Sequence, residues 1–403
     1  MELFWLEHKK LWRKKIVKIC VLLCFVYCVI FGSILSFQWF CFGSSDDYTS
    51  AFGNNFDGYT VIKDSQEYAL SFGGELTDET LQKIVSDYQQ MEADGMEEEL
   101  EKTDWQIVNS WLGTLYPELR DTSNYKTMIS YVDPDKLTGF YERRQQVLDE
   151  FLEVSGQVGA EKEFLHQIER KVEKPFRYEW VEGWSTLLGS MVADLGVVMA
   201  LFLGIVLSSL FAGEWHDNTS TLVLTTRNGW GKIALAKILT GLAFTVELFA
   251  LLAVSNVISQ LFFMGTAGWD MPIQNIKLIA VAPMNMLQAE IYEYAFVLLG
   301  AIGFAGIVMF ISAAVKNNVL TLLLSLAVVY GPMMIVEYLP YEMQKALDLI
   351  PLVGSSTDIF RTNTFRIFGK LIWSPYLLIT IPVLIGILCM PFAIKSWSRR
   401  MKA

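Results

Sequence analysis

The sequence predicts an all-α polytopic membrane protein with six transmembrane helices and a mostly helical extracytoplasmic domain. Of its 403 residues, 53% are hydrophobic, and they occur in clusters rather than evenly. Six of these clusters are long enough for the roughly 20 residues that cross a hydrocarbon core about 30 Å thick. The charges are also segregated: residues 41–182 hold 30 acidic and 13 basic side chains, a net −17, which leaves +6 for the rest.

The apolar clusters and the acidic segment divide the chain into four parts. Residues 1–15 form a cytoplasmic amphipathic helix, 16–40 the first transmembrane helix, 41–182 the extracytoplasmic domain, and 183–403 the remaining five transmembrane helices. The six apolar runs are 16–37, 187–211, 233–263, 287–315, 319–336 and 371–394. The short connection 214–237 and the longer loop 338–370 lie on opposite sides of the membrane in this arrangement.

Basic residues orient the predicted spans. Lys and Arg side chains precede the first span, follow the sixth, and occur in the short connections after the second and fourth spans. With six spans all four regions fall on one side, and short basic loops remain cytoplasmic. We therefore expect a multi-pass protein of the cell membrane with both termini in the cytoplasm and residues 41–182 outside.

The N-terminal segment has an amphipathic pattern. The apolar pair Phe4 and Trp5 is followed about seven residues later by a second apolar pair, Leu11 and Trp12, and lysines surround both pairs. This pattern predicts a helix that lies in the inner leaflet and leads into the first span. The alternative is an unstructured basic tail, which the tryptophans disfavour.

Three cysteines repeat every fourth residue along the first span. Cys20, Cys24 and Cys28 share one helix face, and no histidine or carboxylate joins them there. A metal site is conceivable, but the missing ligands favour small side chains that pack a helix contact. We expect no metal site in the chain.

Helical periodicity fills most of the extracytoplasmic segment. Thr77 is a plausible N-cap for a first helix, whose apolar face carries Leu81, Ile84, Val85, Tyr88 and Met91. Further helices are expected at 105–115, from about 137 to 152 with Asp135 near its cap, and from 164 to 172. A short β-like run occupies 59–63 before them. About 140 residues with this pattern can form a small core.

Small residues mark close helix contacts within the membrane. The second span has a small residue at every fourth position, and the fourth span has a shorter glycine series: Gly196, Ala200, Gly204, Ser208 and Ala212, then Gly300, Gly303 and Gly306. Such ridges let neighbouring helices approach closely in lipid. In the outer loop 338–370, residues 341–349 are expected to form a short helix.

The connection 214–237 is polar and has an ordered pattern. Glu214 ends the second span, a Thr-Ser-Thr cluster follows, and Leu224, Arg227, Lys232 and Lys237 lead into the third span. A short helix here would lie on the membrane surface, with one apolar and one polar side. This is typical of a docking element for a soluble partner. The alternative is a solvated loop whose positive charge only fixes orientation.

The same connection resembles the cytoplasmic loop of ABC-2-type transporter permeases. The matching residues are Glu214, Asn218-Thr219, Leu224, Arg227 and Lys237, with Asn218 in place of the usual glycine and Thr226 in place of the frequent proline. Residues 312–317, Ser-Ala-Ala-Val-Lys-Asn, resemble the end of the family's fourth span. The resemblance covers about 260 residues of the membrane portion and says little about the segment between the first two spans.

The resemblance implies the membrane subunit of an ATP-driven exporter. Its partners would be separate ABC ATPase subunits, a second permease subunit, identical or related, and the lipid bilayer, with no nucleic acid. ATP and Mg would be bound by the ATPase and no cofactor by this chain. The residues expected to couple to the ATPase are Glu214, Thr219, Leu224, Arg227, Lys232 and Lys237.

Motifs for catalysis by the chain itself are missing. No G-x-x-x-x-G-K-[ST] sequence occurs, so a P-loop for ATP is excluded. Only three histidines are present, none in paired spacing, and no serine nucleophile elbow is found. The chain is expected to be a transport subunit without catalytic residues.

One carboxylate lies near the middle of a predicted span. Inserting the charged Glu247 side chain into lipid with the third span costs on the order of 2.5–3.5 kcal/mol of free energy, unless the side chain faces protein or water. With Asn256 further along the helix, it is a candidate for the translocation path; the alternative is an internally hydrogen-bonded or protonated structural glutamate. Four acidic residues are expected close to outer ends of spans, within reach of solvent: Asp194, Glu290, Glu293 and Glu337.

Two other functional classes remain open. A secondary transporter would have inverted repeats and spans broken near the midplane, whereas prolines cluster only in the sixth span, at Pro375, Pro382 and Pro391. A membrane-anchored sensor or immunity protein would bind a peptide through the outer domain. Six spans without a cytoplasmic output domain disfavour a sensor.

Overall fold

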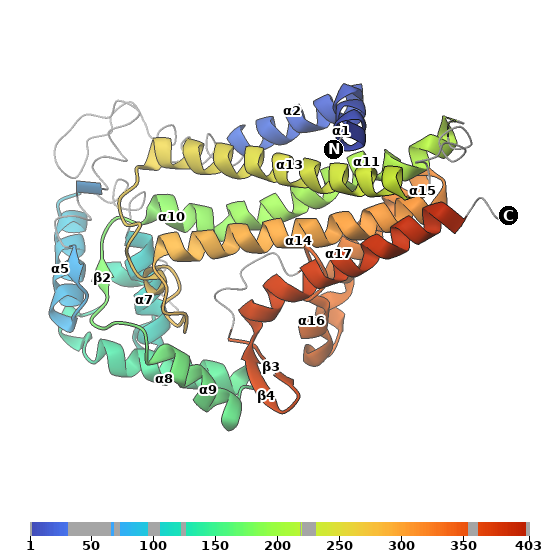
Figure 1. Cartoon of the computed structure of the whole chain (residues 1–403). Helices are drawn as coiled ribbons and strands as arrows, with labels where there is room; N and C mark the ends of the chain where they lie inside the picture. The colour runs from blue at the N-terminus through green and yellow to red at the C-terminus, as the bar shows by residue number, and fades with distance from the viewer. Residues whose placement is uncertain are drawn as a thin grey trace.

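The computed structural model describes residues 2–30, 66–67, 73–95, 105–121, 126–217, 219, 231–353 and 362–399. It is about 75% helical. Within these residues, five helices are long and apolar enough to cross a membrane. The chain is therefore an all-α membrane protein, with the long helices side by side and a group of shorter helices at one end of them (Figure 1).

The first predicted span is described only in its inner part. Helix α1 (Glu2–Arg13) is followed by α2 (Lys15–Val29), and the remainder of the predicted span lies outside the described residues. Figure 1 shows α1 lying across α13 and α2 running alongside it. Cys20, Cys24 and Cys28 are all buried and belong to the apolar core between the long helices. This is the packing role that their spacing favours.

The long helices surround α14 (Met286–Val315). It packs against α11 (Val192–His216), α13 (Lys232–Met264), α15 (Asn318–Ile335) and α17 (Ser374–Arg399). Asn285 and Gln288 form a reciprocal capping box at its N-terminus, which pairs two otherwise free backbone amides. At the other end Lys316 takes a left-handed backbone conformation and separates α14 from α15.

Glycines allow α14 and α17 to touch through their backbones. A Cβ atom added to Gly306 would lie 2.4 Å from the carbonyl oxygen of Gly386, and one added to Gly386 would lie 2.6 Å from the Cα of Gly303. Any side chain at these positions would therefore push the two helices apart. Gly303 and Gly306 of the predicted glycine series therefore serve a close helix contact, whereas Gly300 faces Leu352 of the following loop.

Polar and small residues join α11 to its neighbours. The Ser312 hydroxyl of α14 donates to the carbonyl oxygen of Ser208 at 2.7 Å and accepts from the amide of Phe211 at 3.1 Å. Gly204 faces Leu322 and Leu326 of α15. The second predicted span is not one continuous α-helix from residue 187. Helix α10 (Glu182–Thr186) and a π-helical segment, η5 (Leu187–Met191), precede α11.

The domain predicted to be extracytoplasmic, called the outer domain below, has four described α-helices: α5 (Asp78–Ala93), α7 (Trp105–Leu115), α8 (Phe140–Val154) and α9 (Ala160–Glu169). Thr77 caps α5 as predicted, since its hydroxyl accepts from the amide of Thr80. Asp135 does not cap α8; it lies in a short 3₁₀ helix, Pro134–Lys136, and Asp78 accepts from the amides of Gly139 and Phe140 instead. A cap supplied from another helix is invisible to local sequence spacing.

Short strands close the outer domain, and its core extends to the long helices. Strand β1 (Gly74–Glu75) pairs with β2 (Arg177–Tyr178), whereas the β-like run 59–63 lies outside the described residues. The buried Arg144 donates to the carbonyl oxygens of Leu278 and Ala280 at 2.7 and 3.2 Å. These carbonyls belong to the connection between α13 and α14, so the outer domain is fastened to the membrane part.

The loop before the last long helix contains both a helix and a hairpin. Helix α16 (Tyr341–Leu347) falls within the predicted short helix. Strands β3 (Thr364–Ile367) and β4 (Lys370–Trp373) form an antiparallel hairpin that the sequence analysis did not predict. The hairpin takes up residues 371–373, so α17 begins at Ser374, three residues later than the predicted span, and extends to Arg399.

The backbone contact between α14 and α17 gives a first testable consequence. Gly386→Ala should lower the free energy of unfolding by about 1–3 kcal/mol, because its methyl group must displace the backbone of α14. Gly331→Ala in α15 is a matched control, since nothing lies within 4 Å of the added Cβ. Tryptophan fluorescence during thermal unfolding in detergent measures both. Equal melting temperatures for the two variants would contradict the tight packing.

Candidate functional site

A compact set of charged side chains lies where α1, α11 and α13 meet. We call Glu7, Lys10, Glu214, Thr219 and Lys237 the inner polar cluster. Glu214 accepts from Lys10 Nζ at 2.6 Å and from Lys237 Nζ at 2.8 Å through the same oxygen, Oε1. Its other oxygen accepts from the Thr219 hydroxyl, and Lys237 Nζ also donates to Glu7 at 2.7 Å.

The inner polar cluster is buried and balanced in charge. The side chains of Glu214 and Lys237 are 4% and 2% exposed, whereas Lys10 is 52% exposed. Two carboxylates and two ammonium groups cancel each other. A buried ion is strongly destabilising when its partner is removed, because the remaining charge keeps its desolvation cost. The cluster therefore fixes the relative positions of three helices.

The environment of the cluster also shifts the pKa values of two lysines on its edge. Burial lowers the pKa of Lys10, but the hydrogen bond and charge of Glu214 outweigh it and leave that pKa above its usual value. Burial, with the nearby charges of Lys237 and Lys10, lowers the pKa of Lys14. Lys14 Nζ donates to the Ser209 hydroxyl at 2.9 Å rather than to a carboxylate.

The sequence of α1 places its contribution on one face. Glu7, Lys10 and Lys14 are spaced by three and four residues, so they follow one side of a helical path. Leu11 lies between them and is only 2% exposed. Trp5 and Leu6 remain exposed on the other side, where they suit contact with lipid in an interfacial helix.

The structure brings together three of the six predicted coupling residues. Glu214, Thr219 and Lys237 belong to the inner polar cluster. Lys232 does not; it is exposed at the start of α13 and lines a groove between α13 and the beginning of α1. Leu224 and Arg227 lie outside the described residues.

Glu247 contacts α1. One of its carboxylate oxygens accepts from Trp12 Nε1 at 3.0 Å, and the other lies 3.2 Å from His8 Nε2. The side chain is 43% exposed. The ring of Trp12 also packs against Phe244, one turn earlier on α13. Glu247 thus holds the N-terminal helix on the outside of α13.

Asn256 faces a different neighbour. It is 2% exposed, and its amide donates to the hydroxyl of Tyr294 on α14 at 3.2 Å. Glu247 and Asn256 were predicted together as candidates for one translocation path. Each has a separate protein partner, α1 for Glu247 and α14 for Asn256, so the two residues do not form one site.

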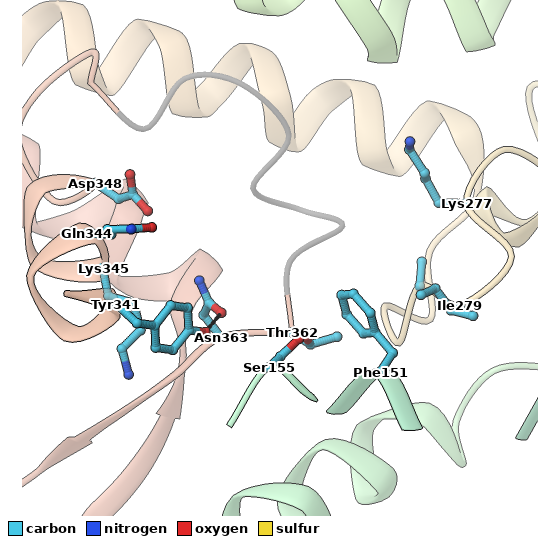
Figure 2. A pocket seen from close by; sticks show the side chains of 11 residues that line it. Phe151, Ser155, Lys277, Ile279, Tyr341, Gln344, Lys345, Asp348, Thr362 and Asn363 are labelled. Atoms are coloured by element: carbon cyan, nitrogen blue, oxygen red, sulfur yellow. Dashed lines mark hydrogen bonds between the residues drawn. The ribbon is translucent and has the colours of Figure 1, made fainter. Parts of the chain in front are cut away.

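A pocket of about 470 Å³ opens beside the group of shorter helices. It lies where the end of α8, the α13–α14 connection, α16 and residues 362–363 meet. Figure 2 shows Phe151 and Lys277 on one side and Gln344 and Asp348 on the opposite side. Its size suits a small molecule, and its lining mixes aromatic, amide and charged side chains of both signs.

Several residues of these sites were not singled out from the sequence. Glu7, Lys10 and His8 are partners of predicted residues, and the three-and-four spacing on α1 was the signal that could have identified them. Glu290 and Glu293 were expected within reach of solvent, but their exposed fractions are only 4% and 2%. The α13–α14 connection and α10 cover this end of α14, together with the outer domain.

Comparisons with protein-family models, with curated proteins and with solved structures find no match for this chain.

The buried ion pair leads to a double-mutant test. Glu214→Gln and Lys237→Met should each lower the free energy of unfolding by about 3–5 kcal/mol, because each leaves a buried charge with an incomplete set of partners. The double variant should lose less than the sum of the two, which measures their coupling. Thermal or denaturant unfolding in detergent provides the free energies.

Lys232→Met is the matched control for Lys237→Met. It removes the same charge from an exposed position five residues earlier on α13, and should change the free energy of unfolding by no more than about 0.5 kcal/mol. Strict additivity of Glu214→Gln and Lys237→Met would rule out a direct energetic link between them.

Proposed function

We propose that this chain is the permease subunit of an ATP-driven exporter of the ABC-2 type. The observation that carries the proposal is the inner polar cluster, in which Glu214 joins α11 to Lys237 of α13 and to Lys10 of α1. The two ends of the connection 214–237 and the N-terminal helix thus share one set of buried ion pairs. A force applied to this connection reaches three helices at once.

Coupling would follow from this arrangement. A soluble ATPase that closes on ATP docks on the connection and on α1, and its movement shifts the inner ends of α11 and α13 together. If the cluster broke during this movement, buried charges would lose their partners at a high cost in free energy. The three helices therefore move as a group. ATP and Mg are held by the ATPase, and the chain pairs with a second permease, identical or related, to enclose a path for the exported substrate.

The proposal includes six spans, with the first formed by residues 16–37. Both termini and the connection 214–237 then face the cytoplasm, and the outer domain faces outward. The distribution of basic residues supports this orientation. The mostly exposed apolar side chains of α2, among them Leu22 and Leu23, suit contact with lipid.

Single cysteines test the orientation. Glu150→Cys on the exposed surface of α8 should react with a membrane-impermeant maleimide on intact cells, whereas Lys232→Cys should react only after permeabilisation. Both positions are exposed, so accessibility within the fold does not bias the comparison. The test uses a cysteine-free background. Labelling of position 232 but not 150 on intact cells would invert the orientation.

Complex formation tests the proposed coupling. The full chain is co-expressed with the P-loop ATPase encoded by a neighbouring reading frame and purified through a tag on the permease. Leu224→Asp combined with Arg227→Glu should reduce the recovered ATPase about tenfold or more, because a few large or charged side chains carry most of the energy of an interface. Glu150→Arg, on the opposite side of the membrane in this orientation, is the control and should leave recovery unchanged.

The possible results separate two parts of the proposal. If no P-loop ATPase associates with the unmodified chain, the exporter assignment is lost. If the ATPase associates equally with the unmodified chain and the double variant, the assignment stands and the connection 214–237 is not its docking element.

A further inference from the structure

A second polar site lies between α13 and α14, toward the outer domain. Glu290 is 4% exposed and Gln260 is 0% exposed. Within the described part of the chain, neither amide atom of Gln260 has a hydrogen-bond partner, and the Tyr294 hydroxyl is the one side-chain group that interacts with the Glu290 carboxylate, whose oxygens are otherwise unsatisfied. Buried polar groups without partners are rare in folded proteins and call for a specific explanation.

The helix register places these two side chains opposite each other. Helices α13 and α14 are consecutive and antiparallel, and the hydrogen bond between Asn256 and Tyr294 marks one level of their contact (Figure 1). One turn outward from this level lie Gln260 on α13 and Glu290 on α14.

Among the residues that the structure describes, no basic side chain pairs with Glu290. The sequence contains no Lys, Arg or His from 178 to 215, from 238 to 276, or from 278 to 315. These stretches include α10, nearly all of α11, the part of α13 beyond Lys237, and α14. The titratable groups on the neighbouring elements include Tyr294 and Glu293 of α14, Glu182 of α10, Cys28 of α2, and Asp270 and Lys277 of the α13–α14 connection. Of these only Lys277 carries a positive charge, and it is exposed and lines the pocket near α16 rather than pairing with Glu290.

An ionised carboxylate in a low-dielectric interior requires neutralisation, by a side chain or by a bound species. We propose that Glu290 binds an exchangeable monovalent cation, a proton or a sodium ion, between α13 and α14. The Gln260 amide oxygen and the Tyr294 hydroxyl are the further oxygen ligands closest in register. Oxygen donors are the ligands that hard cations prefer.

Glu290 lies near the outer end of α14, four residues after its start at Met286, about 6 Å along a helix that rises 1.5 Å per residue. The α13–α14 connection and α10 cover this end of the helix, so a cation from the outer solution must pass between them to reach Glu290. The inner polar cluster lies near the other end of α13 and is already neutral, so it needs no ion. An ATP-driven exporter does not require an ion site for energy. This site therefore adds an ion-dependent step to the proposed function, and it rests on burial and charge rather than on that function.

Carbodiimide labelling tests the proposal, because dicyclohexylcarbodiimide reacts with protonated carboxyl groups in apolar surroundings. The full chain in lipid nanodiscs is treated across a range from about pH 5 to about pH 9, which covers the ordinary and the burial-shifted range of glutamate. Peptide mass spectrometry then locates the adduct. We expect labelling at Glu290 that falls about tenfold as the pH rises, and its loss in Glu290→Gln.

Sodium distinguishes the two cations. Protection of Glu290 by sodium chloride, but not by choline chloride at equal ionic strength, identifies a sodium site; equal labelling in both salts, with the same dependence on pH, identifies a proton site. Infrared spectra of the unmodified chain and of Glu290→Gln provide a second readout that does not depend on reagent access, through the carbonyl band of the neutral acid. A Glu290 band that neither pH nor sodium changes would show a fixed structural acid and overturn the proposal.

Discussion

A charge inside a low-dielectric helix bundle needs a partner, and the pair formed by Glu214 and Lys237 is where the inner side of this protein meets that requirement. Helices α11 and α13 cannot separate at this point without breaking this pair, which would leave each charge with an incomplete set of partners. Glu7 and Lys10 complete the balance, so α1 is held against the same two helices. The arrangement of the inner side depends on this one pair.

The contact of α13 with α14, near the other end of α13, has a different charge balance. Lys237 of α13 is neutralised by carboxylates from two other helices, whereas the buried Glu290 carboxyl group of α14 has no basic partner among the described residues. At one end of α13 the chain's own carboxylates neutralise Lys237, and at the other end a cation from solution neutralises Glu290. Helix α13 thereby links a fixed electrostatic contact to an adjustable one.

Elements with a local cause were predictable from the sequence. Apolar length identified the long helices, the Thr77 cap marked the start of α5, and the four-residue spacing of Cys20, Cys24 and Cys28 indicated a buried stripe. The contact of Lys10 with Glu214 joins positions 204 residues apart, which no local pattern encodes. The burial of Glu290 depends on the segments that cover the end of α14, and the β3–β4 hairpin takes up the first three residues of the predicted sixth apolar run. In each of these cases tertiary contacts decided the outcome.

The glycine contact between α14 and α17 limits how this molecule can move. Where two backbones meet without side chains between them, sliding or rotation produces an immediate clash, so these helices behave as one rigid body. Helix α15 is different, because only 17% of its most apolar stretch is buried. Any motion between the long helices must therefore place its hinges outside the α14–α17 pair, whereas the lightly buried α15 has more freedom to move.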